Sequence, residues 1–310
     1  MDVLPERAPH VSVVVLSWNR REKLDRCIRS LSRVEYPNVT IFVADNGSEE
    51  FDAAAIPVEF GGVRLVRNDA NLGVAAGKNA MLRRLLSDGQ TEFILFLDDD
   101  TISHPRLIRR LVDIHDPQRG WDILQPAVYD LDRPESLYAY GGHFNHYTGG
   151  VERITRAPRP EDPTDEASRI DFALGCGMFT HKSVFEAVGL FDEAFSPWYG
   201  EDVDFCLRAA KRHYESVVVP DAILWREIGK GASVRLSRSM SLRSEKRVYL
   251  MKKHSRWRQW IPYVVLAPVA SALAALFDFA RGRPHAGIGR VVGFTRGLTR
   301  GVAAGRSAAF

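Results

Sequence analysis

The chain has few of the features that mark several common protein classes. Its 310 residues include three cysteines, Cys27, Cys176 and Cys206, which lie far apart and form no CxxC pair. A disulfide framework is therefore not expected, and a reducing compartment is favoured. Residues 1–10 carry charge and proline instead of an apolar run, so we expect no signal peptide there.

Two common phosphate-binding loops are also missing. No GxGxxG follows the first apolar run, and the segment NLGVAAGKN at 71–79 lacks the GxxxxGK[ST] spacing of a Walker A loop. Both absences argue against the corresponding dinucleotide-binding and ATP-binding folds. The 71–79 segment still offers two glycines, which let the backbone approach a ligand closely, and Lys78, which can pair with a phosphate.

Charge is divided unevenly along the sequence. Residues 226–310 hold 17 of the 42 Lys/Arg and 3 of the 39 Asp/Glu, a balance of +14, which leaves −11 on residues 1–225. A basic segment of this kind is typical of proteins that bind an anionic membrane surface or nucleic acid. A merely solvated basic surface is the alternative.

The basic segment also contains an uncharged stretch, Trp260 to Phe277, that borders the length needed to span a bilayer. Pro262 and Pro268 interrupt this stretch, and basic residues flank it, which favours a shallow or re-entrant membrane segment; a helix that spans the bilayer is the alternative. The coupling of charge to an apolar block favours a membrane over nucleic acid. We therefore predict two domains, residues 1–235 and a C-terminal helical segment at 236–310.

The first 120 residues alternate between apolar runs and helical patterns, which is typical of an α/β domain with a mostly parallel sheet flanked by helices. Ligands bind such sheets at the carboxyl ends of the strands, and the polar clusters 17–19, 45–48 and 98–100 all follow predicted strands. Residues 120–170 are less regular. Strands are predicted at Val11–Leu16, Thr40–Ala44, Val63–Val66, Phe93–Leu97 and Val217–Val219, and helices at Arg21–Ser32, Ala75–Leu86, Lys182–Val188, Phe205–Arg212 and Ser237–Trp260.

Three adjacent carboxylates, Asp98, Asp99 and Asp100, directly follow the fourth strand. They repel one another unless a cation is present, and Mg²⁺ or Mn²⁺ typically binds one or two carboxylates together with phosphate oxygens. Alternate residues of an extended segment face the same side, so Asp98 and Asp100 can address one site. Stabilisation of the N-terminus of the next helix is the alternative.

A second acidic cluster, Glu201-Asp202-Val203-Asp204, follows Trp198-Tyr199-Gly200. A carboxylate here can act as a general base toward an acceptor hydroxyl if it lies near the first cluster. The alternative is a helix N-terminus in which Asp204 pairs with Arg208 one turn later. One residue can serve in both ways.

Seven segments, taken together and in order, resemble the family 2 glycosyltransferases of the GT-A fold, in a rhamnosyltransferase-like branch. The resemblance covers residues 11–235. Its motifs are VSVVVLSWNR (11–20), VADNGSEE (43–50), NLGVAAGKN (71–79), FLDDDT (96–101), GCGMF (175–179), VGLFDEAF (188–195) and GEDVDFCLR (200–208).

The resemblance implies an inverting, metal-dependent transfer of a sugar from a nucleotide-sugar donor, a UDP- or dTDP-sugar, to an acceptor hydroxyl. By position, Asp202 resembles the catalytic base, and Asp98 and Asp100 resemble the pair that binds Mn²⁺ or Mg²⁺. The donor side is expected to comprise Leu16, Ser17, Asn19, Asp45, Asn71, Gly73, Lys78, Asn79, Asp98, Asp99 and Arg226. The acceptor side is expected to comprise Gly175, Cys176, Gly177, Trp198, Tyr199 and Glu201.

One position departs from the family pattern. Many relatives carry a His shortly after the last strand that can join the metal, and here Arg226 stands in its place. Arginine cannot bind a metal but can bind phosphate with two donors. The sequence therefore predicts that Arg226 or Lys230 meets the diphosphate directly, and it leaves a weakened metal dependence open.

The expected acceptor is a glycan or a polyprenyl-linked glycan of cell-surface polysaccharide biosynthesis. The protein is expected at the cytoplasmic face of the cell membrane, attached peripherally through the C-terminal segment, and no nucleic acid is expected as a partner. A sugar nucleotidyltransferase and a non-catalytic nucleotide-sugar-binding module are the alternatives. The first lacks its expected Gly-rich signature, and the presence of two acidic clusters argues against the second.

Overall fold

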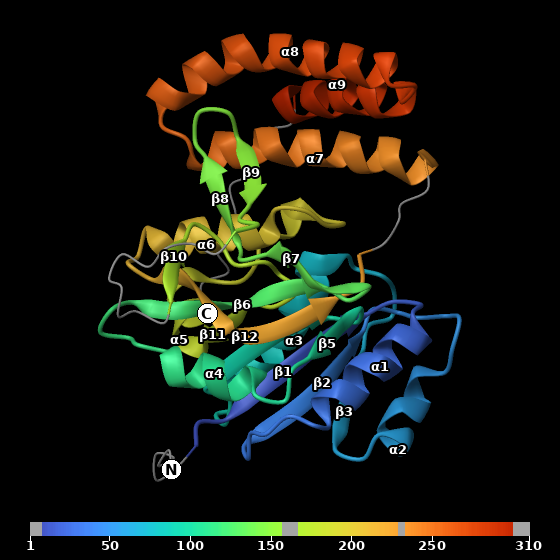
Figure 1. The fold of residues 1–310 in the computed structure, drawn as a ribbon, viewed down its shortest axis with the longest axis vertical. Coiled ribbons are helices and arrows are strands. Elements are labelled where there is room, and N and C mark those ends of the chain that lie inside the picture. The colour runs from blue at the N-terminus through green and yellow to red at the C-terminus, as the bar shows by residue number, and fades with distance from the viewer. Residues whose placement is uncertain (1–7, 157–166, 229–232, 300–310) are drawn as a thin grey trace. The chain divides into compact units, whose positions relative to one another are not determined.

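The computed structural model describes residues 8–156, 167–228 and 233–299. The chain forms two compact units (Figure 1). The first comprises residues 1–142 and 153–228, and the second comprises residues 143–152 and 229–310. A short hairpin from the middle of the chain belongs to the second unit together with the C-terminal helices, so neither unit is one continuous stretch of sequence. The predicted division was a single boundary at residue 235.

A mixed sheet of ten strands lies at the centre of the described part of the first unit, in the order β10-β12-β6-β11-β4-β1-β2-β3, with β5 beside β12 and β7 beside β6. The first four strands pair in parallel. The bounds are β1 Val11–Ser17, β2 Val39–Asp45, β3 Val63–Arg67, β4 Phe93–Asp98, β5 Thr101–Ser103, β6 Trp121–Asp130, β7 Arg133–Ala139, β10 Ser168–Ile170, β11 Phe179–His181 and β12 Glu215–Arg226.

Helices cover both faces of this sheet (Figure 1). On one face, Leu24 and Ile28 of α1 join a buried cluster with Val13 and Leu95. On the other face, the Phe96 ring meets the Phe185 and Phe191 rings. The helices are α1 Arg21–Leu31, α2 Ile56–Glu59, α3 Val74–Ser87, α4 Leu107–Ile114, α5 Lys182–Val188 and α6 Glu201–Ala210, with short 3₁₀ turns at Ala53–Ala55 and Glu193–Phe195.

The predicted elements of the first 120 residues match the structure within one or two residues. Residues 120–170 contain short strands, as a less regular region would, but they also contain β6, a ten-residue strand that was not predicted and is buried along almost its whole length. Its apolar pattern is broken by Asp122, Gln125 and Pro126. The buried polar side chains have partners, since Asp122 contacts His115 and Gln125 accepts a hydrogen bond from the Leu174 N–H.

The second unit consists of the hairpin β8 Gly142–Asn145 and β9 Gly150–Arg153 and of three helices, α7 Ser233–His254, α8 Trp257–Ala280 and α9 Pro284–Thr299. The helix α8 continues through Pro262 and Pro268, so the predicted interruption is wrong. Glycines allow α9 to approach its neighbour closely. A Cβ atom on Gly293 would lie 1.9 Å from the Ser241 carbonyl oxygen of α7.

Candidate active site

The carboxyl ends of three neighbouring strands meet at one edge of the sheet. Ser17 of β1 is paired in register with Asp45 of β2, and Leu16 is paired with Asp98 of β4. The three polar clusters that follow these strands in the sequence therefore lie next to one another. Parallel strands with buried side chains produce this convergence, because each strand leaves the core at the same level.

The acidic triplet divides into two sets. Asp98 and Asp100 both contact Arg226, with Asp98 Oδ2 at 2.8 Å from Nη2 and Asp100 Oδ1 at 3.2 Å from Nε. Asp99 turns instead into the core, where Ser17 Oγ donates a 2.9 Å hydrogen bond to it. The side chains thus alternate as predicted. The strand β5 follows the triplet before α4 begins, so the triplet does not cap that helix.

Burial raises the pKa of Asp99 to about 6, against the opposing effects of the Arg20 charge and the Ser17 hydrogen bond. Arg20 Nη1 lies 3.2 Å from Asp99 and 3.4 Å from Asp100. Two arginines, one from each side, therefore compensate the charge of the triplet. Asp99 acts mainly within the protein, where it joins the end of β1 to the turn after β4.

The position of Arg226 follows from the sheet. It is the last residue of β12 and lies opposite Thr101 of β5. Its carbonyl accepts a hydrogen bond from the Leu131 N–H, and the next residue, Glu227, donates its N–H to the Asp100 carbonyl. The backbone is therefore fixed on both sides, while the side chain stays 27% exposed. Lys230, the alternative phosphate contact, lies outside the described residues.

The carboxylates of Asp98 and Asp100 converge on one point, which suits a hard divalent ion that takes its remaining ligands from phosphate and water. Within the described ranges, no group of three His, Cys, Asp or Glu side chains is arranged to hold a metal. The nearby Cys176 is a poor ligand, because burial raises its thiol pKa to about 11. The residues therefore fit Mg²⁺ or Mn²⁺ only together with a phosphorylated ligand.

The loops after β1 and β2 are bonded to each other beside the triplet. Asn19 adopts a left-handed conformation with φ of 52°, and its side-chain oxygen accepts hydrogen bonds from the Glu49 and Glu50 N–H groups. Asp45 is fully buried, and its carboxylate accepts hydrogen bonds from the Ser48 N–H. Backbone groups thus fix the orientation of the residue predicted to contact the donor base.

Asn46 is a site residue that the sequence pattern did not single out. Its amide nitrogen donates to Asn71 Oδ1 and to the Gly73 carbonyl, and its oxygen accepts from Asn68 Nδ2 and the Leu72 N–H. One buried side chain therefore shapes the whole 68–73 loop. The DNG turn marks a polar strand end, but nothing local reveals a partner 25 residues away.

We expect Asn46→Ala to lower the stability of the first unit by about 4 kcal/mol, since four described hydrogen bonds are lost and each contributes about 1 kcal/mol net. The melting temperature should fall by about 8–16 °C, and nucleotide affinity should fall with it. Asn38→Ala is the matched control, because its side chain donates a single described hydrogen bond, to Ala8, at the other end of β2. Equal effects of both variants on nucleotide affinity would contradict this role.

The second acidic cluster forms the first turn of α6, and the predicted helix start with its internal ion pair is present. Asp204 pairs with Arg208 at 2.9 Å within the helix. Asp202 Oδ2 accepts a 2.9 Å hydrogen bond from the Gly175 N–H. Burial, with the neighbouring Asp202 and the more distant Asp98 charge adding to it, raises the pKa of Glu201 to about 7. The charge of Asp98 contributes least to this shift, so the two acidic clusters are close enough to interact electrostatically.

Two predicted donor residues have internal partners. Lys78 is fully buried, and its ammonium donates a 2.7 Å hydrogen bond to the Gly175 carbonyl. Asn79 bonds the backbone of Phe191. Gly175 is thus held from both sides, because its N–H binds Asp202 and its carbonyl binds Lys78. Phosphate binding by Lys78 stays a prediction, and its described contact positions the turn that carries Asp202.

The predicted acceptor residues lie around this turn and the segment before α6. A Cβ atom on Gly177 would come within 3.0 Å of Pro126, so the turn packs closely on β6. Tyr199 has a φ of 94°, and its ring lies edge-on to the Trp198 ring at 6.2 Å. Both rings are half-buried.

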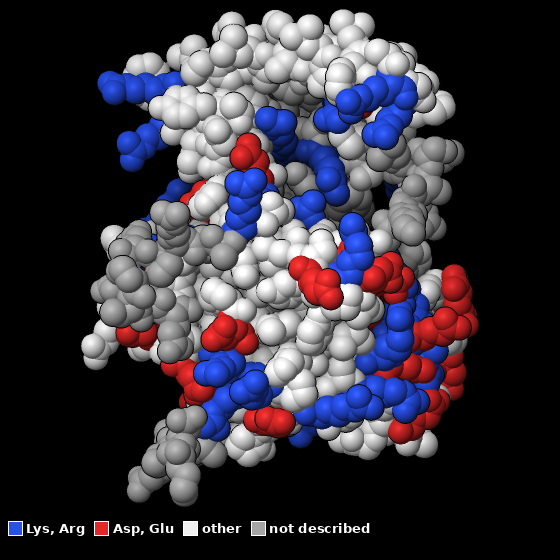
Figure 2. All heavy atoms as spheres, in the orientation of Figure 1, with Lys and Arg blue, Asp and Glu red and all other residues white. Residues whose placement is uncertain are grey.

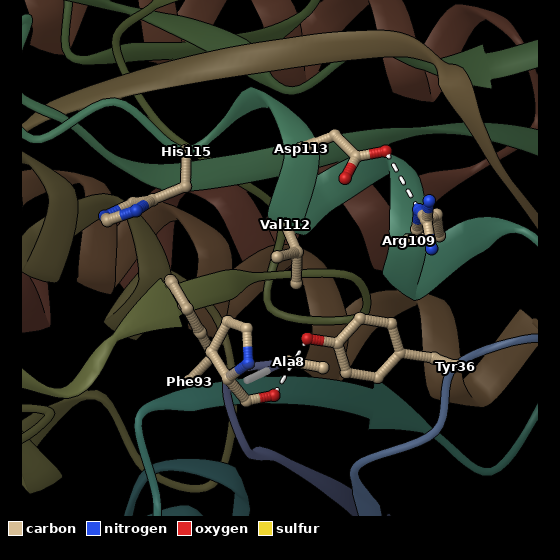
Figure 3. A pocket seen from close by; sticks show the side chains of 8 residues that line it. Ala8, Tyr36, Phe93, Arg109, Val112, Asp113 and His115 are labelled. Carbon is tan, nitrogen blue, oxygen red and sulfur yellow. Dashed lines mark hydrogen bonds and ion pairs between the residues drawn. The ribbon is translucent and has the colours of Figure 1, made fainter. Parts of the chain in front are cut away.

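A separate cavity lies at the opposite end of the sheet, where Phe93 begins β4 (Figure 3). Tyr36 in its wall donates a hydrogen bond to the Pro9 carbonyl, and Arg109 pairs with Asp113 at 3.3 Å. Asp98 stands at the other end of the same strand. This cavity therefore contains none of the predicted site residues.

Comparison with solved structures supports the fold. A mannosyltransferase from Pyrobaculum calidifontis, in complex with GDP-Man and Mn²⁺, aligns with 96% of this chain and 90% of its own, at a TM-score of 0.60 and 15% identity. GalNAc-T7 with UDP, GalNAc and Mn²⁺ aligns with 94% of this chain, which spans 56% of that chain, at a TM-score of 0.65 and 15% identity. The predicted GT-A fold is confirmed.

Sequence comparison identifies the family. An N-acetylglucosaminyl-diphospho-decaprenol L-rhamnosyltransferase of Mycobacterium tuberculosis is 26% identical over 275 residues, which cover 83% of this chain and 86% of that protein. The model of the family described as "Glycosyltransferase like family 2" matches residues 8–257. The match extends over most of the chain and includes every residue of the site described above. The chain belongs to the family 2 glycosyltransferases.

Proposed function

We propose that the protein is an inverting, metal-dependent glycosyltransferase that moves a sugar from a nucleotide-sugar donor to a hydroxyl of a glycan or lipid-linked glycan. The observation that carries the proposal is that both acidic clusters lie near the 175–177 turn, since Asp202 bonds the Gly175 N–H and the charges of Asp98 and Asp100 act on the Cys176 thiol. Asp98 and Asp100 converge from the end of β4, and Asp202 is oriented by Gly175 at the start of α6. Inversion needs a base on the face of the sugar opposite the leaving group.

Asp202 is the proposed base. Its two oxygens accept hydrogen bonds from the N–H groups of Gly175 and Val203, which fix the orientation of the carboxylate. We place the sugar acceptor on this side of the site. In this position it removes the proton from the attacking hydroxyl as the new bond forms. Trp198 and Tyr199 present half-buried rings on the same side, suited to stack on the acceptor.

The donor is proposed to lie between the loops after β1, β2 and β4. Asp45 receives the base, and the backbone around Leu16, Ser17 and Asn19 lines the nucleoside. Asp98 and Asp100 hold the divalent ion, which stabilises the charge that develops on the departing diphosphate. Two relatives with the same fold were solved with Mn²⁺ and a nucleotide or nucleotide-sugar, which supports this arrangement.

The proposed donor is a UDP- or dTDP-sugar, and the proposed acceptor is a polyprenyl-linked or growing glycan of a cell-surface polysaccharide. The name of the mycobacterial relative, a rhamnosyltransferase that acts on a diphospho-decaprenol-linked sugar, supports a lipid-linked acceptor. The match covers 86% of the relative's length.

A product assay tests the proposed activity. The purified chain is incubated with Mn²⁺, a panel of nucleotide-sugars and a polyprenyl-diphospho-sugar acceptor. Release of nucleoside diphosphate together with a new glycoside is the expected result. Pyrophosphate release would indicate a sugar nucleotidyltransferase instead, and nucleotide binding without any turnover across the panel would indicate a binding module.

We also propose that the second unit attaches the enzyme to the cytoplasmic face of the membrane. The helix α8 is long and apolar enough to cross a bilayer by length and composition. It packs on α9 along one side, and its other side exposes large apolar residues, among them Ile261, Leu266 and Leu273. Figure 2 shows this uncharged surface between groups of basic side chains, and anionic lipid headgroups attract basic residues that flank an apolar segment.

A variant in which both Leu266 and Leu273 are replaced by aspartate should bind vesicles that contain an anionic phospholipid at least tenfold more weakly. Each leucine that the membrane buries contributes about 1.5–3 kcal/mol to binding. Both side chains are exposed, so the fold should persist. Val58→Asp, on the exposed surface of the first unit, is the control. Vesicle sedimentation provides the measurement. Equal sedimentation of all three proteins would contradict attachment through α8.

A further inference from the structure

The guanidinium of Arg226 lies at the point where the carboxylates of Asp98 and Asp100 converge. We propose that Arg226 is a latch: it holds this carboxylate pair closed against a free divalent ion and yields the pair only when the ion arrives with a nucleoside diphosphate. The inference rests on the proposed metal-dependent function and adds a binding order to it.

The geometry of the contacts supports competition. Nη2 and Nε of one guanidinium face Asp98 and Asp100 respectively, at 2.8 and 3.2 Å. A divalent ion bound by the same two carboxylates needs oxygen distances of about 2.0–2.2 Å, so ion and guanidinium compete for the two oxygens that face Arg226. Asp100 is buried, and its ion pair with Arg226 compensates its charge away from water. A free ion must therefore displace an existing ion pair.

Once displaced, the Arg226 side chain can contact the bound diphosphate, which stabilises the complex with ion and nucleotide. The Arg226 backbone is fixed between β5 and the Leu131 N–H, so only the side chain moves. The side chain is 27% exposed and so opens toward solvent. A diphosphate bridged by the ion on Asp98 and Asp100 brings new negative oxygens within reach of the released guanidinium. The ligand thus restores the charge compensation that the ion removes.

Arg20 does not provide the same block. It contacts Asp99 at 3.2 Å and the outer oxygen of Asp100 at 3.4 Å, and no contact with Asp98 is among its described ion pairs. Its charge therefore compensates the negative charge of the triplet whether or not Arg226 contacts Asp98 and Asp100. The competing group is specifically Arg226.

Binding of Mn²⁺ to the full-length protein tests the latch without catalysis. Free Mn²⁺ is followed by electron paramagnetic resonance, with and without UDP or dTDP. For the natural protein we expect the nucleotide to tighten Mn²⁺ binding at least tenfold and, by linkage, Mn²⁺ to tighten nucleotide binding by the same factor. For Arg226→Gln we expect Mn²⁺ binding without nucleotide to tighten at least tenfold and the coupling to shrink.

Arg26→Gln is the charge control, because Arg26 pairs with Glu227 and not with the triplet in the described contacts. Arg226→Lys, which keeps the charge but not the two-donor fork, should fall between the natural protein and Arg226→Gln, and it provides a second test if the glutamine variant misfolds. Unchanged or weaker nucleotide-free Mn²⁺ binding in both Arg226 variants would overturn the latch alone. Absence of Mn²⁺ binding by the natural protein even with nucleotide would overturn the metal-dependent function as well.

Discussion

Replacing Asp202 with asparagine is expected to lower kcat by about 10²- to 10⁴-fold, the usual contribution of a positioned general base. The amide is isosteric, and its one oxygen can still accept the hydrogen bond from Gly175, which holds the turn, while the bond from the Val203 N–H is lost. It cannot take up the acceptor proton. Nucleotide affinity should therefore stay within about threefold of the natural value, because the base contacts the acceptor and not the donor.

The neighbouring Glu201 is the competing candidate for the catalytic base. Burial raises its pKa to about 7, so it is partly protonated at neutral pH, and it is a second carboxyl group on the same helix turn. Glu201→Gln and Asp202→Asn should be measured side by side, together with the control Asp25→Asn, whose partly exposed carboxylate pairs with Arg21 on α1. A loss of less than tenfold in Asp202→Asn, with the large loss in Glu201→Gln, would assign the base to Glu201.

Replacing Asp100 with asparagine should lower kcat/KM at least 100-fold and weaken binding of the donor in the presence of Mn²⁺. The carboxylate is one of two that converge on the proposed ion, and an amide is a much weaker ligand for a hard cation. Steady-state kinetics over a range of Mn²⁺ concentrations provide the measurement.

Asp99→Asn is the matched comparison within the same triplet. Asp99 points to Ser17 instead of Arg226, and burial already raises its pKa to about 6. An amide in its place keeps a hydrogen bond to Ser17, so we expect a loss of no more than about tenfold. Equal losses in both variants would contradict the division of the triplet into outward and inward side chains.

The sheet edge was predictable because its signals are local. Each buried strand is a continuous apolar run that ends in polar residues, as at Leu97 and Asp98, and parallel pairing brings such ends together. The alternation of Asp98, Asp99 and Asp100 likewise follows from extended backbone. The family resemblance then supplied the roles of residues that spacing alone left open, Asp202 above all.

Other features depend on contacts between distant segments and could not be predicted. The buried polar side chains Asp122 and Gln125 break the apolar sequence pattern by which β6 could have been predicted. Their partners, His115 and Leu174, lie in other elements of the chain. Arg226 looked like a free phosphate ligand in the sequence, but the pairing of β12 with β5 places it against the triplet. The contact of Lys78 could not be predicted either, because its partner Gly175 lies 97 residues away in the sequence.

The central claim is that the donor and its ion bind at the end of β4, between Asp98 and Asp100. Diffraction from crystals of the full chain grown with Mn²⁺ and UDP or dTDP, recorded at the manganese absorption edge, tests it most directly. The account predicts an anomalous peak about 2.0–2.2 Å from a carboxylate oxygen of Asp100, with the Arg226 guanidinium moved onto the diphosphate. A nucleotide bound elsewhere, with Arg226 still between the two carboxylates and no peak beside them, would contradict it.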